Sequence, residues 1–319
     1  LSNMRESFSE VLTPLQFEEI FGKKLSPKCA HLVKSLNLRY RFLTIDERDA
    51  HILEVINFLK KDITPSGSSR KPLWEKGWGQ NLDDFIKSDL DLSELLPHYY
   101  RRGKSIMRLQ GSFILPEDPL FEAKFLKIIH LILSEEYLGK YSNIYEMGAG
   151  PCHNIAGFAE NLVGKYFYST DWVAPSVEIA KLLESNKNKL NFSTHTFSSS
   201  IFNFFEPDQN LRFAPNSVAL TFGSLEQIGK KFDALLEYFL YQDGVEFIHI
   251  EPFLECYAQD SLFDQLGLLY SQKRGYLEGY LDRLKALSLE GLIEIKSIQK
   301  ILGSAFHDGW TMVTWKKLK

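Results

Sequence analysis

The stretch from Ile144 to Asn154 reads Ile-Tyr-Glu-Met-Gly-Ala-Gly-Pro-Cys-His-Asn. Its apolar start predicts a short buried strand over residues 143–147 that ends in a glycine loop and leads into a helix. Two glycines one residue apart permit a tight turn and let the backbone approach a ligand closely. Glu146 precedes the first glycine by two positions, where its charge disfavours a pyrophosphate and suits a ligand with positive charge. The dinucleotide fingerprint would place a small residue where this chain has His153.

Strands and helices alternate on the C-terminal side of this loop. Strands are predicted over residues 166–171, 217–222 and 245–250, with two closing strands over 293–298 and 311–315. Helices are predicted over residues 154–163, 175–185 and 229–241, with a long helical region over 261–290. This order predicts an α/β fold with a Rossmann-like, mostly parallel sheet of about seven strands, flanking helices and one antiparallel strand. Ligands of such sheets bind outside the carboxyl ends of the strands.

The first part of the chain is predicted to consist of helices joined by irregular segments. A helix is predicted over residues 44–61, because Thr44 and Glu47 fit a capping box ahead of an apolar stripe. Residues 64–69 form a break rich in turn formers, and an amphipathic helix runs from Phe121 to about Gly139. An N-terminal, mainly helical domain is therefore expected over residues 1–118.

Composition excludes several classes of protein. The chain has 319 residues, and 37 basic against 41 acidic side chains give a net charge of −4. This balance argues against non-specific nucleic-acid binding. No apolar run is long enough to predict a membrane span, and residues 1–6 lack the pattern of a signal peptide. Three widely spaced cysteines argue against a disulfide framework or a structural zinc site. We therefore expect a cytoplasmic protein with no metal site.

The pattern apolar-apolar-acid-x-Gly-x-Gly at residues 144–150 resembles motif I of class I S-adenosylmethionine-dependent methyltransferases. Asp171 closes the second strand about 20 residues further on, where a carboxylate accepts hydrogen bonds from ribose hydroxyls. Segments 225–229, 249–252 and 303–307 also resemble uncharacterised bacterial members of this superfamily. The resemblance covers about residues 143–319 and implies S-adenosylmethionine as cofactor and S-adenosylhomocysteine as product.

The resemblance also implies which residues bind the cofactor. Trp172 would lie against the adenine ring, and the stretch around Asn203 would read the adenine amino group, although related enzymes commonly have Asp there. The implied cofactor-binding residues are Glu146, Gly148, Ala149, Gly150, Asn154, Asp171, Trp172, Asn203, Phe204 and Gly223. Residues 119–319 would then form the S-adenosylmethionine-binding methyltransferase domain, and residues 1–118 a substrate or lid domain.

Four residues are catalytic candidates because of their places at the ends of strands: one follows the strand over 217–222, two lie at the end of the strand over 245–250, and one lies in the connection between the last two strands. They are Glu226, Glu251, His249 and His307. Three have a named structural alternative: Glu226 as a helix cap, His249 as a packed core histidine and His307 as a solvated loop residue. Glu251 points towards the ligand end of the sheet, and neither a catalytic nor a structural role is favoured for it. Lys273 or Arg274 would engage an anionic substrate, or would belong to a solvated helix face. A cluster of N-terminal residues would form the other wall of the acceptor pocket, or would simply pack within a small helical domain: Trp74, Trp78, Asn81, His98, Tyr99, Tyr100 and Arg101.

The leading hypothesis is an enzyme that methylates a small-molecule or metabolite acceptor, with oxygen favoured over nitrogen. Ser224-Leu225-Glu226-Gln227 stands where base amino methyltransferases have Asn/Asp-Pro-Pro-Tyr/Phe, which disfavours a nucleic-acid substrate. Three alternatives remain: a protein or peptide methyltransferase, a non-catalytic S-adenosylmethionine-binding module, and a nicotinamide oxidoreductase. Glu146 and His153 together disfavour the last of these. The sequence gives no indication of the oligomeric state.

Overall fold

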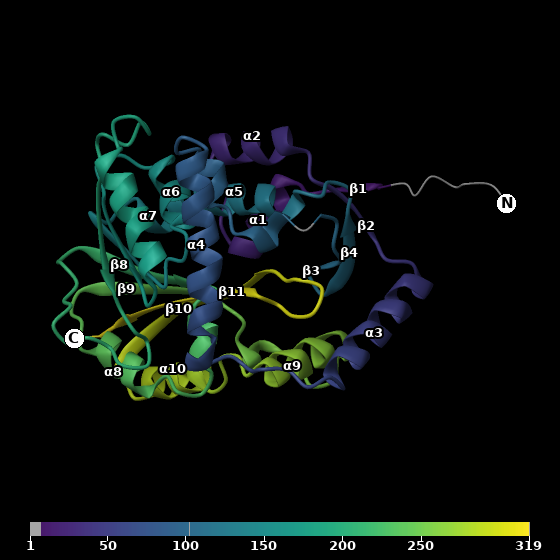
Figure 1. Ribbon diagram of the computed structural model, residues 1–319. Coiled ribbons are helices and arrows are strands. Elements are labelled where there is room, and N and C mark those ends of the chain that lie inside the picture. Colours follow the sequence, from purple (N-terminus) through teal and green to yellow (C-terminus); the bar gives the residue numbers. More distant parts are fainter. Residues whose placement is uncertain (1–7, 102, 319) are drawn as a thin grey trace.

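The computed structural model describes residues 8–101 and 103–318. The residues 1–6 that lack a signal-peptide pattern lie outside this part. A seven-stranded sheet forms the centre of the molecule, with the strand order β10–β11–β9–β8–β5–β6–β7. Figure 1 labels β8, β9, β10 and β11 of this sheet. The strands of the sheet are β5 (Asn143–Met147), β6 (Tyr166–Asp171), β7 (Thr196–Ile201), β8 (Ser217–Phe222), β9 (Val245–Glu251), β10 (Ile293–Leu302) and β11 (Trp310–Lys317). The predicted Rossmann-like sheet is confirmed.

Strand direction within this sheet defines where a ligand binds. The five strands from β7 to β9 are parallel, while β11 is antiparallel to both β9 and β10. The chain runs outward from β5 through β6 to β7, and then returns to place β8 on the other side of β5. The carboxyl ends of β5 and β8 therefore flank the switch point, where open α/β sheets bind their ligands.

Alternate side chains of each strand enter two separate cores, as the period of two requires. Ile144 belongs to the core that contains residues of α5, α6 and α7, whereas Tyr145 belongs to the core beneath α8 and α10. These helices are α5 (Phe121–Leu133), α6 (His153–Ala159), α7 (Ala174–Ser185), α8 (Asp233–Leu240) and α10 (Tyr280–Leu289). Because both faces are covered, β9 is buried along its whole length, and β5 and β8 are buried except at one end residue each.

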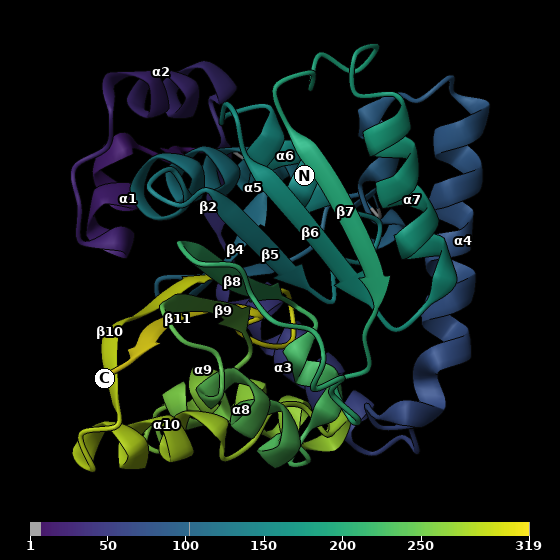
Figure 2. The same cartoon turned by 90° about the vertical axis from the view of Figure 1, so that its left-hand side faces the viewer.

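The N-terminal part contains the expected helices and also a sheet. Its helices are α1 (Pro14–Phe21), α2 (Pro27–Leu36), α3 (Ile45–Leu59) and α4 (Lys71–Lys87). Thr44 forms the predicted capping box with Glu47 at the start of α3. Figure 2 shows α4 running beside α7, and α3 contacts α9 (Leu262–Arg274).

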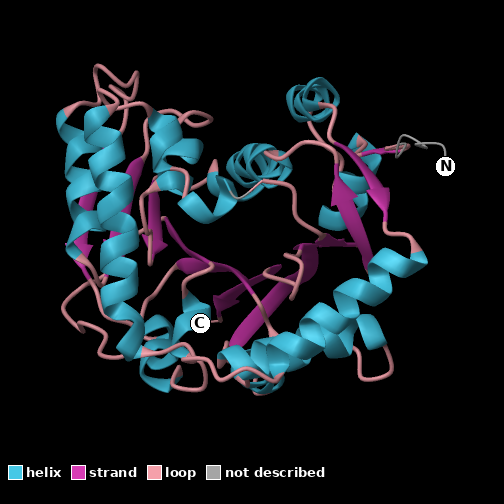
Figure 3. Ribbon diagram, turned by 45° about the vertical axis from the view of Figure 1, so that its right-hand side comes forward, coloured by secondary structure: helices cyan, strands magenta, loops and turns pink. Residues whose placement is uncertain are grey.

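A second, four-stranded antiparallel sheet was not predicted, and some of its strands lie at the right of Figure 3. Backbone hydrogen bonds between Arg108 and Gly303, the residue after β10, join the two sheets. The strands of the second sheet are β1 (Glu10–Val11), β2 (Arg39–Phe42), β3 (Met107–Leu109) and β4 (Ser112–Pro116), in the order β1–β2–β4–β3. These strands are too short to show a period of two. Gln110 and Gly111, both with positive φ, make the two-residue turn between β3 and β4.

The long helical region expected over 261–290 is two helices. Arg274 ends α9, and Gly275 follows in the left-handed conformation with φ of 67°. Gly279, with φ of 89°, then precedes α10. Two glycines at positive φ interrupt the helix, since other residues adopt this conformation only with strain. Across the described residues, no helix has both the length and the apolar character needed to cross a membrane.

Candidate functional site

A pocket that opens to solvent lies at the carboxyl ends of β5, β6 and β8. The glycine loop, the end of β6, the segment after β7 and the start of the loop after β8 form its floor. Residues of α4 and of the 3-10 helix His98–Arg101 cover it. Its lining includes Trp74, Trp78, Tyr99, Tyr100, Glu146, Gly148, Ala149, Gly150, His153, Asn154, Asp171, Trp172, Phe204, Phe205, Gly223, Ser224 and Gln227.

At both glycines of the loop, a side chain would come too close to a neighbouring residue. Gly148 has φ of 75°, and a Cβ there would lie 2.5 Å from Cβ of Ser224. Gly150 has φ of 53°, and a Cβ there would lie 3.2 Å from the ring of Trp78. The amides of Gly148 and Ala149 donate to the carbonyl oxygen of Thr170, which ties the loop to the end of β6. The loop is therefore a fixed cradle in the pocket wall.

Glu146 is a buried carboxyl group on this wall, with 1% of its surface exposed. Its Oε1 accepts a hydrogen bond of 2.7 Å from Nδ2 of Asn154, whereas its Oε2 is buried without a hydrogen-bond partner. Burial raises the pKa of Glu146 to about 8, with a smaller contribution from Asp171. Buried polar atoms are normally paired, so a free oxygen that lines a pocket indicates a ligand with a donor or a positive charge.

A histidine that the sequence analysis missed orients Asn154. Nε2 of His130, on α5, lies 2.9 Å from Oδ1 of Asn154. Burial lowers the pKa of His130 to about 4, so the ring is neutral and its N–H donates to Asn154. The amide of Asn154 is thereby turned with its donor toward Glu146. Nothing in the sequence distinguishes His130 from other residues of an amphipathic helix.

Replacing Gly157 with alanine is expected to destabilise the fold by about 1–3 kcal/mol. A Cβ at Gly157 would lie 2.1 Å from Nδ1 and 2.8 Å from Cγ of His130, so the whole imidazole must move. The matched control is Gly77→Ala in α4, where a Cβ meets nothing within 4 Å and alanine is expected to stabilise the helix by about 1 kcal/mol. Urea unfolding measures both variants. Equal effects of the two substitutions would contradict the close packing of His130 on α6.

Asp171 both closes the glycine loop and faces the pocket. Its Oδ2 accepts a hydrogen bond of 2.8 Å from the Gly150 amide, and its Oδ1 accepts one of 3.2 Å from the Val173 amide. Burial raises the pKa of Asp171 to about 6, against the lowering effect of these amides. Each carboxylate oxygen has two lone pairs, so both keep acceptor capacity for a ligand.

Aromatic rings provide the remaining walls, and one predicted residue lies elsewhere. Trp172 packs near Phe205, with ring centroids 5.9 Å apart, and both line the pocket. Trp74 and Trp78 stack at 5.3 Å and also line the pocket. Asn203 is not part of the pocket lining, because its side chain accepts a hydrogen bond from the Phe205 amide within its own turn.

Two of the catalytic candidates are fully engaged within the protein. Glu251 accepts hydrogen bonds from the amides of Ser224, Leu225 and Glu226, and so caps the 3-10 helix Leu225–Ile228. His249 is completely buried between Oγ1 of Thr221 at 3.0 Å and the hydroxyl of Tyr280 at 3.1 Å. Burial lowers the pKa of His249 to about 3, which keeps the ring neutral.

The other two candidates lie closer to open space. Glu226 is half-buried, and its Oε1 accepts a hydrogen bond of 2.8 Å from the pocket residue Gln227. Burial, with a further contribution from Glu251, raises the pKa of Glu226 to about 8. His307 is also half-buried; its Nδ1 lies 2.9 Å from Oγ of Ser304, and burial lowers its pKa to about 4.

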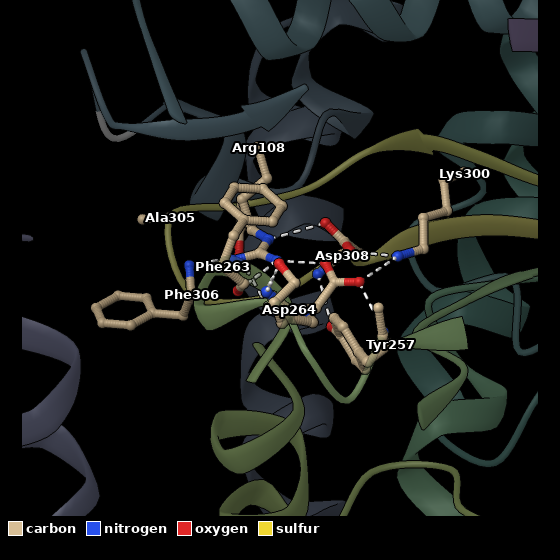
Figure 4. A network of polar contacts seen from close by, with 12 residues as sticks. Arg108, Tyr257, Phe263, Asp264, Lys300, Ala305, Phe306 and Asp308 are labelled. Atoms are coloured by element: carbon tan, nitrogen blue, oxygen red, sulfur yellow. Dashed lines mark hydrogen bonds and ion pairs between the residues drawn. The ribbon is translucent and has the colours of Figure 1, made fainter. Parts of the chain in front are cut away.

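The loop that carries His307 is fixed by a buried ionic network (Figure 4). Nε of Arg108 donates to Oδ1 of Asp308 at 2.8 Å, and Nζ of Lys300 lies 3.3 Å from Asp264 and 3.4 Å from Asp308. The guanidinium of Arg108 lies 3.5 Å from the ring centroid of Phe263. This network joins β3 of the small sheet to α9 and to the loop between β10 and β11.

The remaining residues of the sequence analysis have structural partners or lie at the pocket. Asn81 donates to the carbonyl oxygens of Glu94 and Leu96, and His98 pairs with Asp84. Cys152 is fully buried, and burial raises the pKa of its thiol well above the ordinary value. Among the described residues, no group of three or more His, Cys, Asp or Glu side chains is arranged to hold a metal ion.

Comparison with known proteins gives matches among solved structures only. No protein-family model matches the chain, and no curated protein matches it. One matching structure is an O-methyltransferase of neocarzinostatin biosynthesis in complex with S-adenosylmethionine and 2-hydroxy-5-methyl naphthoic acid (13% identity, 62% of this chain, 58% of that chain, TM-score 0.39). Another is the N-methyltransferase NodS from Bradyrhizobium japonicum in complex with S-adenosylhomocysteine (10% identity, 64% of this chain, 90% of that chain, TM-score 0.43).

A third matching structure is N,N-8-amino-8-demethyl-D-riboflavin dimethyltransferase from Streptomyces davawensis (13% identity, 62% of this chain, 57% of that chain, TM-score 0.40). The chain thus spans less than two thirds of the first and third of these proteins.

Proposed function

We propose that this chain is an S-adenosylmethionine-dependent methyltransferase that acts on a small-molecule acceptor and transfers the methyl group to oxygen. The observation that carries the proposal is the free Oε2 of Glu146, buried beside the glycine cradle at the switch point of the sheet. S-adenosylmethionine fits this site chemically. Its positively charged amino group would be the partner that the free oxygen of Glu146 lacks. Its ribose hydroxyls would donate hydrogen bonds to Asp171. The aromatic rings of the wall suit its adenine.

Bound S-adenosylmethionine supplies a methyl group on a sulfonium centre, which an acceptor attacks in line. The protein's main task is to position donor and acceptor, and such positioning contributes roughly 7–11 kcal/mol to a reaction of this kind. In our proposal Glu146, Asn154 and Asp171 hold the donor, while Trp74, Trp78 and Tyr99 exclude water from it. Residues 1–118, which carry these aromatic side chains, would form the substrate or lid domain.

A hydroxyl acceptor must lose its proton during attack, and we assign the proton acceptor to Glu226. Its half-buried carboxyl group adjoins the pocket through Gln227, and its raised pKa makes it a stronger base than an exposed glutamate. This arrangement supports oxygen over nitrogen as the acceptor atom. His307 is the second candidate. Glu251 and His249 act as positioning residues, because their polar atoms are already bound within the protein.

The affinity for S-adenosylhomocysteine is expected to rise with pH. The ligand's ammonium group favours the charged form of Glu146, so a proton must leave that carboxyl group whenever the pH lies below its pKa of about 8. The affinity should therefore increase by up to about tenfold per unit between about pH 6 and about pH 8. Calorimetric titration of wild-type protein and Glu146→Gln across this range measures the effect. Glu146→Gln keeps the shape and the bond from Asn154 but cannot titrate. An equal pH dependence in both proteins would overturn the role of Glu146.

A further inference from the structure

Two arginines beside the pocket lack a carboxylate partner. Arg70 lies at the start of α4 and Arg274 at the end of α9, and both are half-buried. Nη1 of Arg70 is buried without a hydrogen-bond partner, and Nε of Arg274 reaches only the hydroxyl of Tyr276, at 3.4 Å. Within residues 8–101 and 103–318, no carboxylate lies within ion-pair distance of either guanidinium. Half-buried arginines are normally paired, so their free donors call for an explanation.

Backbone contacts bring three distant segments together at this point. The amide of Ser66 donates to the carbonyl oxygen of Arg274 at 2.7 Å, which ties the loop before α4 to the end of α9. A Cβ at Gly229 would lie 2.8 Å from the carbonyl oxygen of Gly275, so the segment that follows Glu226 is adjacent. The segments that carry the two arginines and Glu226 therefore meet at one place, although Arg70 and Arg274 are 204 positions apart in the sequence.

This site adjoins the proposed cofactor pocket. The guanidinium of Arg70 lies 5.4 Å from the ring centroid of Trp74, which lines the pocket and stacks on Trp78. On the other side, Glu226 is bonded to the pocket residue Gln227. A molecule held by the arginines therefore lies next to the donor and to the proposed proton acceptor.

The balance of charge in this site is positive. Burial and the neighbouring Arg274 lower the pKa of Arg70, which shows that the two guanidinium groups repel each other. Glu226 interacts with both, and one carboxylate against two guanidinium groups leaves the site with a net positive charge even when Glu226 is ionised. Two partly desolvated cations with a single counter-charge are unfavourable, and an anion would relieve that cost.

Planar side chains pack beside Arg274, whose guanidinium lies 5.7 Å from the ring centroid of Tyr276. Tyr270 stacks on Phe306 at 5.0 Å and on His307 at 5.2 Å, and the ring of Tyr276 lies 5.3 Å from that of His307. Such rings bind an apolar or planar body and exclude water from it. The site thus combines a cationic end with an aromatic wall.

We propose that the methyl acceptor carries an anionic group, a carboxylate or a phosphate, that Arg70 and Arg274 bind together, while the rings of Tyr270 and His307 contact its planar or apolar body. Guanidinium groups suit this task because they donate two parallel hydrogen bonds to either anion. The inference rests on the proposed methyltransferase function and names the class of its substrate.

The test uses the full chain loaded with S-adenosylhomocysteine and titrated calorimetrically with benzoate, phenyl phosphate and the neutral benzamide. At least one of the two anions is expected to bind saturably, and benzamide at least about tenfold more weakly. Benzoate and phenyl phosphate distinguish a carboxylate site from a phosphate site. Arg70→Met and Arg274→Met should each weaken the preferred anion by at least about tenfold. The matched control is Arg283→Met, an exposed residue of α10 that pairs with Glu290 at 3.7 Å, and it should change nothing.

Thermal unfolding and the affinity for S-adenosylhomocysteine check that each variant is folded. Binding of benzamide as tight as that of both anions, undiminished binding in Arg70→Met and Arg274→Met, or no saturable binding of either anion would each overturn the inference. Failure of wild-type protein to bind S-adenosylhomocysteine would instead overturn the proposed function. The two failures are therefore distinguishable.

Discussion

Gly148→Ala is expected to lower the affinity for S-adenosylhomocysteine by at least about a hundredfold and the stability by about 3 kcal/mol. Two costs combine at this position. The backbone has φ of 75°, which an alanine adopts only with strain, and the new Cβ would lie 2.5 Å from Cβ and 2.7 Å from Oγ of Ser224. Ser224 cannot move freely, because its hydroxyl donates to the carbonyl oxygen of Met147 and its amide donates to Glu251. The loop must therefore shift at the place where the ligand is expected to bind.

Gly164→Ala is the matched control for this variant. Gly164 has a similar φ of 65°, but a Cβ there meets nothing within 4 Å. Its substitution should lower the stability only through backbone strain, by about 1–2 kcal/mol, and should leave the affinity for S-adenosylhomocysteine unchanged. Urea unfolding and calorimetry with S-adenosylhomocysteine measure both variants. If Gly148→Ala retained wild-type affinity, the cradle would not be the binding site.

Arg108→Met is expected to destabilise the protein by about 3–5 kcal/mol. Arg108 is almost fully buried, and it pairs with Asp308 while its Nη2 donates to the carbonyl oxygen of Phe263 at 3.0 Å. Methionine fills much of the volume but leaves Asp264 and Asp308 with Lys300 as their remaining cation. The cost of two buried carboxylates with one partner is much larger than the loss of a surface pair.

Arg48→Met serves as the control because Arg48 forms an exposed ion pair with Asp49 at 2.8 Å, and its loss should change the stability by less than about 1 kcal/mol. Urea unfolding at neutral pH compares the two variants. Similar effects on the free energy of unfolding would show that the buried network contributes no more than a surface pair. It would then not be what fixes the loop that carries His307.

The parts of the fold that local chemistry dictates were predictable from sequence. The strand over 143–147, the glycine loop and the strand over 166–171 follow from short apolar runs bounded by turn residues. The capping box of Thr44 and Glu47 marked the start of α3 within one residue. The position of the pocket followed from the strand order alone, because the switch point is a property of topology.

Features that depend on distant contacts were not predictable. Strand β7, with the sequence Thr-Phe-Ser-Ser-Ser-Ile, is an edge strand with few apolar residues, so its pairing with β6 decides its conformation. The role of His130 depends on its contact with Asn154, and the proximity of Arg70 to Arg274 depends on a loop that meets α9. None of these residues lies near its partner in the sequence, and no local motif marks it.

Calorimetric titration of the wild-type protein with S-adenosylhomocysteine, run beside NAD, tests the central claim most directly. The glycine cradle, the free oxygen of Glu146 and the aromatic walls predict micromolar binding of S-adenosylhomocysteine and none of NAD. Folded protein that binds neither S-adenosylhomocysteine nor S-adenosylmethionine, or that binds NAD instead, would contradict the account and leave the glycine loop as a structural turn.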